Sequence, residues 1–145
     1  MDRSERILGG MLGVAVGDAL GVPVEFVSRE RLRKKPVQGM TGYGTHNQSP
    51  GTWSDDTSLT LCLAESLVEA GYDPADAGRR FVRWYREGHW TPHGRVFDIG
   101  GTTQQAILRL EAGVAPTLAG PRDEMSNGNG SLMRILPAVL YFADN

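Results

Sequence analysis

The segment GTWSDDTSL at residues 51–59 places two adjacent carboxylates between hydroxyl side chains, where a glycine-rich loop meets a strongly apolar stretch. The apolar spacing that follows predicts a helix over residues 54–70, with Ser54, Asp55 and Asp56 in its first turn. Its expected buried face comprises Leu59, Cys62, Leu63, Leu67 and Ala70. Neighbouring carboxylate and hydroxyl oxygens are the ligands that Mg²⁺, Mn²⁺ or Ca²⁺ prefer. Ser54 also suits an ordinary N-cap, with both acids complementing the helix dipole, and the segment alone favours that simpler interpretation.

The size and composition of the chain indicate one water-soluble domain with room for a hydrophobic core. It has 145 residues, of which 40% are hydrophobic and 22% charged. The net charge of −2 gives no bulk attraction to nucleic acid or to a membrane surface. Cys62 is the single cysteine, so it cannot form an internal disulfide, and its apolar neighbours favour a core position. We therefore expect a cytoplasmic protein.

The first helix is expected over Ser4–Leu20 and ends before Pro23. Along it, glycine recurs at every fourth position, at Gly9, Gly13, Gly17 and Gly21. Each interior glycine costs about 0.5–1 kcal/mol relative to alanine, so we expect a neighbouring element to approach this face closely. The apolar run Ile7–Gly17 is too short to span a bilayer, and the acidic residues before it argue against a signal peptide. These features predict a central, buried helix.

The rest of the chain is predicted to form helices joined by loops rich in glycine, proline and asparagine, because no stretch alternates for long with a period of two. Asp73 and Pro74 form a cap and a first helical residue, and Pro137 should kink or split the last apolar segment. Further helices are expected at 73–87, 102–113 and 131–142, with long loops at 36–53 and 114–130. An apolar helix at the very end of the chain suggests a polypeptide cut short.

The helix expected at 73–87 has two different faces. Its inward residues are predicted to be Phe81, Val82 and Tyr85, opposite a stripe formed by Arg79, Arg83 and Arg86. Arginines beside Trp84 and Trp90 are a combination that can hold a nucleic acid. A solvated helix face is the preferred interpretation, because the total charge is negative.

Four clusters in loops or at helix ends carry residues suited to chemistry. Asp18 interrupts the apolar first helix, and burying it is costly unless it is paired or bound to a cation. The glycine-rich segment 126–131 offers backbone N–H groups ahead of a helix, which suits either a phosphate or a plain loop. The clusters are Gly17–Gly21 with Val24–Phe26, Ser54–Asp56, Asp98–Thr103 and Ser126–Ser131.

Together and in this order, the clusters resemble the ADP-ribosylglycohydrolase family, which includes the dinitrogenase reductase-activating glycohydrolases and removes ADP-ribose from modified side chains. The stretches that carry the resemblance are GDALGVPVEF at 17–26, GTWSDDTSL at 51–59, DIGGTTQQA at 98–106 and NGNGSLMRILP at 127–137. The resemblance implies an all-α, orthogonal multi-helix domain with two divalent cations, Mg²⁺ or Mn²⁺, in a cleft between helices. It also implies a hydrolase that acts on an ADP-ribosylated protein or a small ADP-ribosyl compound.

The resemblance further assigns roles by position. Ser54, Asp55 and Asp56 match the family's first trio of metal ligands, in which threonine is the more usual first member. Glu25 matches an acid on a mobile loop, a candidate for metal contact or general acid–base catalysis, and Asp56 is the second candidate catalytic residue. The residues matched to substrate binding are Asp98 and Gly100 near a ribose, and Ser126, Asn127, Gly128, Asn129 and Gly130 at the diphosphate. At Gly101 the family often has an asparagine.

The implied chemistry is hydrolysis of a glycosidic bond at the ribose anomeric carbon, through an oxocarbenium-like transition state. A divalent cation orients ribose hydroxyls and lowers the pKa of a bound water. Carboxylates at positions 55 and 56 would supply the negative charge that holds such ions.

One departure from the family pattern concerns the metal site. The family completes that site with an Asp-x-Asp-Thr sequence, which does not occur here, so residues 1–145 are expected to be the N-terminal part of a single domain. Three ligands on one turn leave the octahedral shell of Mg²⁺ incomplete, so the chain is expected to be a fragment or to be completed by another polypeptide. A truncated core should expose apolar helix faces and self-associate. The alternatives are a non-catalytic ADP-ribose-binding or structural member of this fold, an inactive fragment, or a helical domain whose acids only cap a helix.

Overall fold

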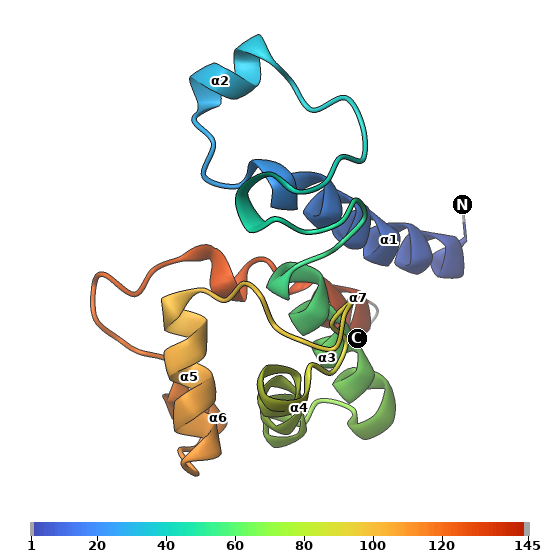
Figure 1. The fold of residues 1–145 in the computed structure, drawn as a ribbon. Helices are drawn as coiled ribbons and strands as arrows, with labels where there is room; N and C mark the ends of the chain where they lie inside the picture. Colours follow the sequence, from blue (N-terminus) through green and yellow to red (C-terminus); the bar gives the residue numbers. More distant parts are fainter. Residues whose placement is uncertain (1, 144–145) are drawn as a thin grey trace.

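The computed structural model describes residues 2–143, a range that contains helices and loops but no β-strand (Figure 1). The α-helices are α1 (Arg3–Gly21), α2 (Arg29–Lys34), α3 (Asp55–Ala70), α4 (Pro74–Glu87), α5 (Gly101–Glu111), α6 (Pro116–Ala119) and α7 (Leu136–Phe142). Three short 3₁₀ helices are η1 (Val22–Val24), η2 (Gly44–His46) and η3 (Asn129–Ser131). The all-α expectation is confirmed. Helices α2 and α6 were not predicted, because each is too short to show a helical period.

The core lies where α3 packs against α4 and where α4 packs against α5. Its centre is a cluster of Leu59, Cys62, Trp84 and Ile107, each no more than 2% exposed. The prediction for Cys62 is thereby confirmed. Ala70, by contrast, is exposed at the end of α3, so its predicted place on the buried face was wrong.

The surface of α4 differs from the predicted arginine and tryptophan face. Trp84, which the sequence placed beside the arginines, is only 1% exposed and packs in the core. Its burial follows from its position one turn after Arg80, on the side of α4 that faces α3. Arg80 pairs with Glu65, Glu69 and Asp76, and Arg86 pairs with Glu111, as a set of close ion pairs. Trp84 is therefore buried and does not contribute to an arginine–aromatic surface that could hold a nucleic acid.

Helix α1 lies at the edge of the fold and is not the central, buried helix that the sequence predicted. Ala19 is its one buried residue. Among the described residues, nothing lies within 4 Å of a Cβ placed at Gly9, Gly13, Gly17 or Gly21. Close approach is seen instead at Gly10, whose Cβ position is 3.3 Å from Leu136 of α7. The four-residue glycine period therefore faces open space in this chain.

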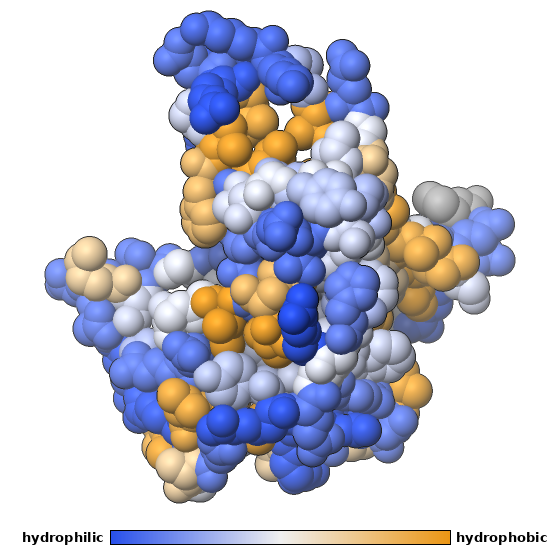
Figure 2. Space-filling model, viewed as in Figure 1, coloured by the Kyte–Doolittle hydropathy of each residue, from blue (hydrophilic) through white to orange (hydrophobic). Residues whose placement is uncertain are grey.

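The outer face of α1 carries an apolar stripe. Leu8, Leu12 and Val16, spaced four residues apart, are 60%, 54% and 48% exposed. Apolar side chains gather on the part of α1 that projects beside the N-terminus (Figure 2). By length and composition alone, Arg3–Val24 is long and apolar enough to cross a membrane, so the estimate made from Ile7–Gly17 was too short. A core helix of a soluble protein passes the same test, so this single helix is weak support for a membrane span.

Proline placement sets the boundaries of two helices. Pro74 occupies the first turn of α4 after the Asp73 cap, which confirms that prediction. Pro137 lies in the first turn of α7, so the segment 131–142 is split rather than kinked, with a turn between η3 and α7. A proline is tolerated there because its missing N–H would have no helical partner.

We expect the chain to self-associate, because pairing the stripe of Leu8, Leu12 and Val16 removes apolar surface from water. Light scattering at increasing protein concentration should give a mass above the 15.8 kDa of one chain. Leu12→Gln should lower that mass. Val68→Gln is the matched control, since Val68 is 85% exposed on α3, away from the stripe, and should leave the mass unchanged. A monomer at every concentration would contradict the prediction.

Candidate functional site

The first turn of α3 is held by a carboxylate from α1. Asp18 Oδ2 accepts hydrogen bonds from the backbone N–H groups of Ser54 and Thr57, at 2.9 and 3.0 Å. The hydroxyls of Ser54 and Thr57 also donate to Asp18, at 2.8 and 2.6 Å. Four donors therefore compensate the half-buried charge that the sequence left unexplained. Because these donors bracket Asp55 and Asp56, Asp18 fixes where both carboxylates lie.

Ser54 acts as the N-cap of α3, as the simpler interpretation required. Its oxygen accepts the backbone N–H of Asp56 at 3.4 Å, while its proton is directed at Asp18. Asp55 and Asp56 occupy the first turn, where carboxylates complement the positive end of the helix dipole. Capping and cation binding are compatible here, because the cap uses Ser54 and leaves both carboxylates available. A direct role for Ser54 as a metal ligand stays a prediction.

Three buried or half-buried acids of the site repel one another. Burial first, and then the negative charges of Asp98, Asp56 and Asp18, together raise the pKa of Asp55 to about 7. Burial likewise raises the pKa of Asp56, followed by repulsion from Asp18 and Glu25. The pKa of Asp98 is raised first by burial and then by Glu25. Such crowding is stabilised by a bound cation, which would offset the repulsion.

These acids open onto one cavity of about 450 Å³. The predicted site residues that line it are Glu25, Asp55, Asp56, Asp98, Gly100, Ser126, Gly128, Asn129 and Gly130. Two predicted residues lie outside its lining, namely Ser54, which faces Asp18, and Asn127, which is exposed. Residues from four loops and two helix ends thus meet around a space large enough for a small ligand.

Part of the cavity wall is built from backbone. Helix α5 begins at this cavity, and among the described residues no side chain caps its first turn. Gly130 lies so close to α5 that a Cβ there would be 2.8 Å from Thr103 Oγ1. Uncapped N–H groups at a helix start suit a phosphate. Gly101, where the family often has asparagine, has nothing within 4 Å of its Cβ position among the described residues, so a side chain would fit there.

Arg134 is a cavity residue that the sequence analysis did not single out. It donates a hydrogen bond to the carbonyl of Gly130, and its guanidinium lies 5.3 Å from the ring centre of Phe81. Burial lowers its pKa, while the charge of Asp55 opposes that effect. Arg134 therefore feels the charge of Asp55 and also fixes the glycine loop. The sequence contained a sign of this residue, because an arginine interrupts the apolar part of the NGNGSLMRILP stretch.

His46 is a second missed residue. Its Nε2 lies 2.5 Å from Glu25 Oε2 and 4.0 Å from Asp98 Oδ2, and its side chain is 13% exposed. The loop that carries it has no periodic pattern, so the sequence offered no sign that it folds back onto Glu25. Glu25, His46 and Asp98 form a group whose ligand atoms all lie within 4.8 Å of one another.

Phe26 stands at the mouth of the cavity with a strained backbone. Its φ angle is 60°, in the left-handed region that costs a non-glycine residue about 1 kcal/mol or more. Its ring is 83% exposed and lies 6.2 Å from the ring of His46. The preceding residue, Glu25, is held by His46 at its carboxyl and by the Thr45 hydroxyl at its carbonyl.

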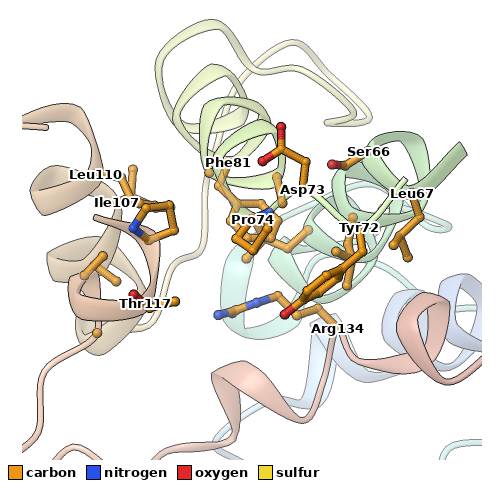
Figure 3. A pocket seen from close by; sticks show the side chains of 18 of the residues that line it. Ser66, Leu67, Tyr72, Asp73, Pro74, Phe81, Ile107, Leu110, Thr117 and Arg134 are labelled. Atoms are coloured by element: carbon orange, nitrogen blue, oxygen red, sulfur yellow. The ribbon is translucent and has the colours of Figure 1, made fainter. Parts of the chain in front are cut away.

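A second cavity, of about 480 Å³, lies between α3, α4, α5 and α6 (Figure 3). Most of its lining is apolar, including Phe81, Ile107 and Leu110. It shares Arg134 and Thr103 with the cavity of the acids, so the two spaces adjoin. The acids and the glycine loop line the cavity of about 450 Å³ and not this apolar one, which makes the former the candidate active site.

The fold is all-α, and the candidate active site brings several carboxylates and the uncapped start of α5 to one cavity. The model of the ADP-ribosylglycohydrolase family matches residues 1–145, and the chain belongs to that family. The ADP-ribosylarginine hydrolase Tri1 of Pseudomonas putida strain GB-1 is 40% identical over 94% of this chain, and 36% of its own length is covered. The ADP-ribosyl-[dinitrogen reductase] glycohydrolase of Rhodospirillum rubrum is 38% identical over 94% of this chain, with 44% of its length covered.

A solved structure described as an ADP-ribosylglycohydrolase-related protein complex is also similar. It aligns with a TM-score of 0.76 and 45% identity, covering 94% of this chain and 42% of that one. The family and fold expected from the four motifs are therefore confirmed. The chain spans less than half the length of each of these relatives.

Asp18→Asn should destabilise the protein by about 2–4 kcal/mol, because it removes a charged acceptor from four donors and turns an amide N–H₂ toward them. Chemical denaturation of both proteins measures the difference. Asp73→Asn is the matched control, since Asp73 caps α4 through one N–H and asparagine caps equally well. A loss no larger than that of Asp73→Asn would refute the role of Asp18.

Asp55→Asn should stabilise the metal-free protein at about pH 8 and have little effect near pH 4. The pKa of Asp55 is about 7 in the folded protein and 3.8 for an ordinary aspartate, as in the unfolded chain. The folded state therefore binds the proton more tightly. The free energy of unfolding therefore falls as pH rises from about 4 to 7, by up to about 4 kcal/mol, and asparagine lacks this loss. Melting of both proteins in chelator across this range tests it. A difference independent of pH would contradict it.

Proposed function

We propose that the chain forms the acid-bearing and phosphate-binding part of a metal-dependent hydrolase that removes ADP-ribose from ADP-ribosylated protein side chains or related ADP-ribosyl compounds. The observation that carries this proposal is that the acids and the glycine loop face one cavity of about 450 Å³. Two relatives support the reaction class, namely the ADP-ribosylarginine hydrolase of Pseudomonas putida and the ADP-ribosyl-[dinitrogen reductase] glycohydrolase of Rhodospirillum rubrum.

The proposed cation ligands are Asp55 and Asp56, with Ser54 as a third oxygen. Both carboxylates are held in one turn, and their repulsion is what a divalent cation would relieve. Their hard oxygens fit Mg²⁺ or Mn²⁺, and we propose two such ions. When bound, a divalent cation supplies the charge that orients ribose hydroxyls and lowers the pKa of a water molecule.

The substrate would lie across the cavity. The first turn of α5, with Gly100, and the loop at 127–130 offer N–H groups to a diphosphate, whereas the Ser126 N–H already donates to the Asp123 carbonyl. Arg134 holds that loop through the Gly130 carbonyl, so it is expected to position the loop rather than to contact the reacting atoms. Asp98 lies on the acid side, near the position proposed for the ribose.

Glu25 is proposed to transfer the proton that hydrolysis requires. A water oxygen forms the new bond to the anomeric carbon, the bond from that carbon to the side-chain nitrogen or oxygen breaks, and the leaving atom gains a proton. The carboxyl of Glu25 lines the cavity and contacts His46, so it faces the space where this exchange would occur. Asp56 is the second acid proposed to act at the reacting centre.

Another polypeptide segment is proposed to complete the cation shell. The chain spans 36–44% of its relatives' length, and the acids of α3 offer fewer oxygens than an octahedral ion takes. A non-catalytic role in ADP-ribose binding is the second candidate function, favoured by the phosphate-type wall that this chain carries by itself.

The first test is ADP-ribose release from an ADP-ribosylated arginine substrate with Mg²⁺, with Mn²⁺ and with chelator. We expect cation-dependent release that Asp55→Asn lowers by at least about a hundredfold, because the variant removes a ligand charge. Asp73→Asn, at the N-cap of α4 and outside the cavity of the acids, should retain full release.

Binding separates the two candidate functions. Calorimetry with ADP-ribose should show binding that the variants at Asp55 and Asp73 retain. Binding without release would favour the non-catalytic role or an incomplete site. Neither release nor binding, in a protein that melts cooperatively, would refute the proposed function.

A further inference from the structure

The chain between η1 and α3 makes an excursion that carries α2 away from the other helices (Figure 1). Within it, five of the seven residues at 29–35 are arginine or lysine, and Glu30 is the one acid among them. This short stretch therefore has a net charge of +4, while the remainder of the chain has a net charge of −6. Residues 27–45, which include α2, thus form a basic lobe on an otherwise acidic protein.

Most of the positive charges of the basic lobe have no negative partner. Lys34 pairs with Glu30, and both side chains are more than three-quarters exposed. Four further basic side chains are exposed, and none of them pairs with a carboxylate of residues 2–143, namely Arg29, Arg31, Arg33 and Lys35. By contrast, exposed arginines of α4 are paired with acids. Unpaired charges at this density repel one another, so an acidic partner would stabilise the lobe.

A cavity of about 870 Å³ lies within the basic lobe. Apolar and basic side chains both line it, including Val27, Leu32 and Val37 with Arg31, Lys34 and Lys35. Hydrophilic residues cover the outer part of the lobe, with hydrophobic residues beneath them (Figure 2). No aromatic ring of residues 2–143 lines this cavity, whereas single-stranded nucleic acids are held by stacking on aromatic rings. An apolar lining with a basic edge instead fits a polypeptide segment that has acidic and apolar side chains.

The basic lobe adjoins the candidate active site. Glu25 lines the cavity of the acids, and its neighbour Val24 lines the cavity of the lobe. The Thr45 hydroxyl, on the lobe side, donates to the Glu25 carbonyl at 2.7 Å. A Cβ at Gly44 would collide with the carbonyl of Pro23, so glycine is required where the lobe closes on itself. A polypeptide bound to the lobe would therefore lie beside the mouth of the site.

We propose that the basic lobe binds an acidic, partly apolar segment of the ADP-ribosylated protein, next to the modified side chain. The inference rests on the proposed function and narrows its substrate class, because it makes a protein, rather than a small ADP-ribosyl compound, the preferred substrate. Attraction between the lobe and an acidic segment raises the rate of encounter and selects among modified proteins.

Peptide binding tests the lobe without relying on hydrolysis or on a cation. The probe is a short labelled peptide of glutamate and leucine around one unmodified arginine, and its fluorescence anisotropy is measured in chelator. We expect binding that weakens as salt rises and that is lost when glutamine replaces each glutamate. Arg31→Gln/Lys35→Gln should weaken the binding about tenfold, because it removes two exposed charges. Arg79→Gln/Arg83→Gln, which removes two exposed charges from α4, is the matched control and should bind as the unmutated chain does.

Release of ADP-ribose separates this inference from the proposed function. When both peptides are ADP-ribosylated at the arginine, we expect the glutamate peptide to have the lower KM, and Arg31→Gln/Lys35→Gln to reduce that advantage. Equal KM values with cation-dependent release retained would overturn the inference and leave the proposed function standing. Salt-dependent binding of the glutamate peptide without release would support the lobe as a docking surface while counting against the hydrolase.

Other occupants of the lobe give different results. Tighter binding of single-stranded RNA or of anionic lipid vesicles than of the glutamate peptide would overturn the inference. A lower mass of Arg31→Gln/Lys35→Gln in light scattering would also overturn it, because the occupant would then be a second copy of this chain. An absence of binding by the glutamate peptide at low salt would do the same.

Discussion

The interaction on which the rest of this structure depends is the carboxylate of Asp18 against the first turn of α3. Two backbone N–H groups and two hydroxyls converge on it, so a residue of α1 completes the helix start of another segment. That contact orients the first turn of α3 and therefore the carboxylates of Asp55 and Asp56. Helix α1 has little other attachment to the core, since Ala19 is its one buried residue. The half-buried charge of Asp18 thus attaches α1 to α3, whereas apolar packing holds the other helices together.

The site brings negative side chains and partly positive backbone groups to one cavity. Several carboxylates crowd there, and burial and mutual repulsion raise the pKa of Asp55 to about 7. The same cavity has the N–H groups at the start of α5 and the glycine loop, which Arg134 holds. A cation suits the first set of groups and a diphosphate the second. The adjoining apolar cavity lacks both sets and has no part in the proposed chemistry.

The sequence predicted well those features that depend on local spacing. The Ser54 cap of α3 and the start of α4 at Pro74 could be predicted from capping residues and from proline. Most of the residues named from the four motifs line one cavity. Features that depend on distant contacts were missed. The glycines of α1 were taken as a packing face, yet that face is open, and Trp84 lies in the core. His46 could not be found, because its role comes from a loop that folds back over about twenty residues.

The apolar stripe on α1 has a consequence for how the site can be controlled. In the position of α1 described here, the stripe is exposed while Asp18 holds the first turn of α3. A partner that covered Leu8, Leu12 and Val16 with α1 in this position would therefore also stabilise the contact that orients Asp55 and Asp56.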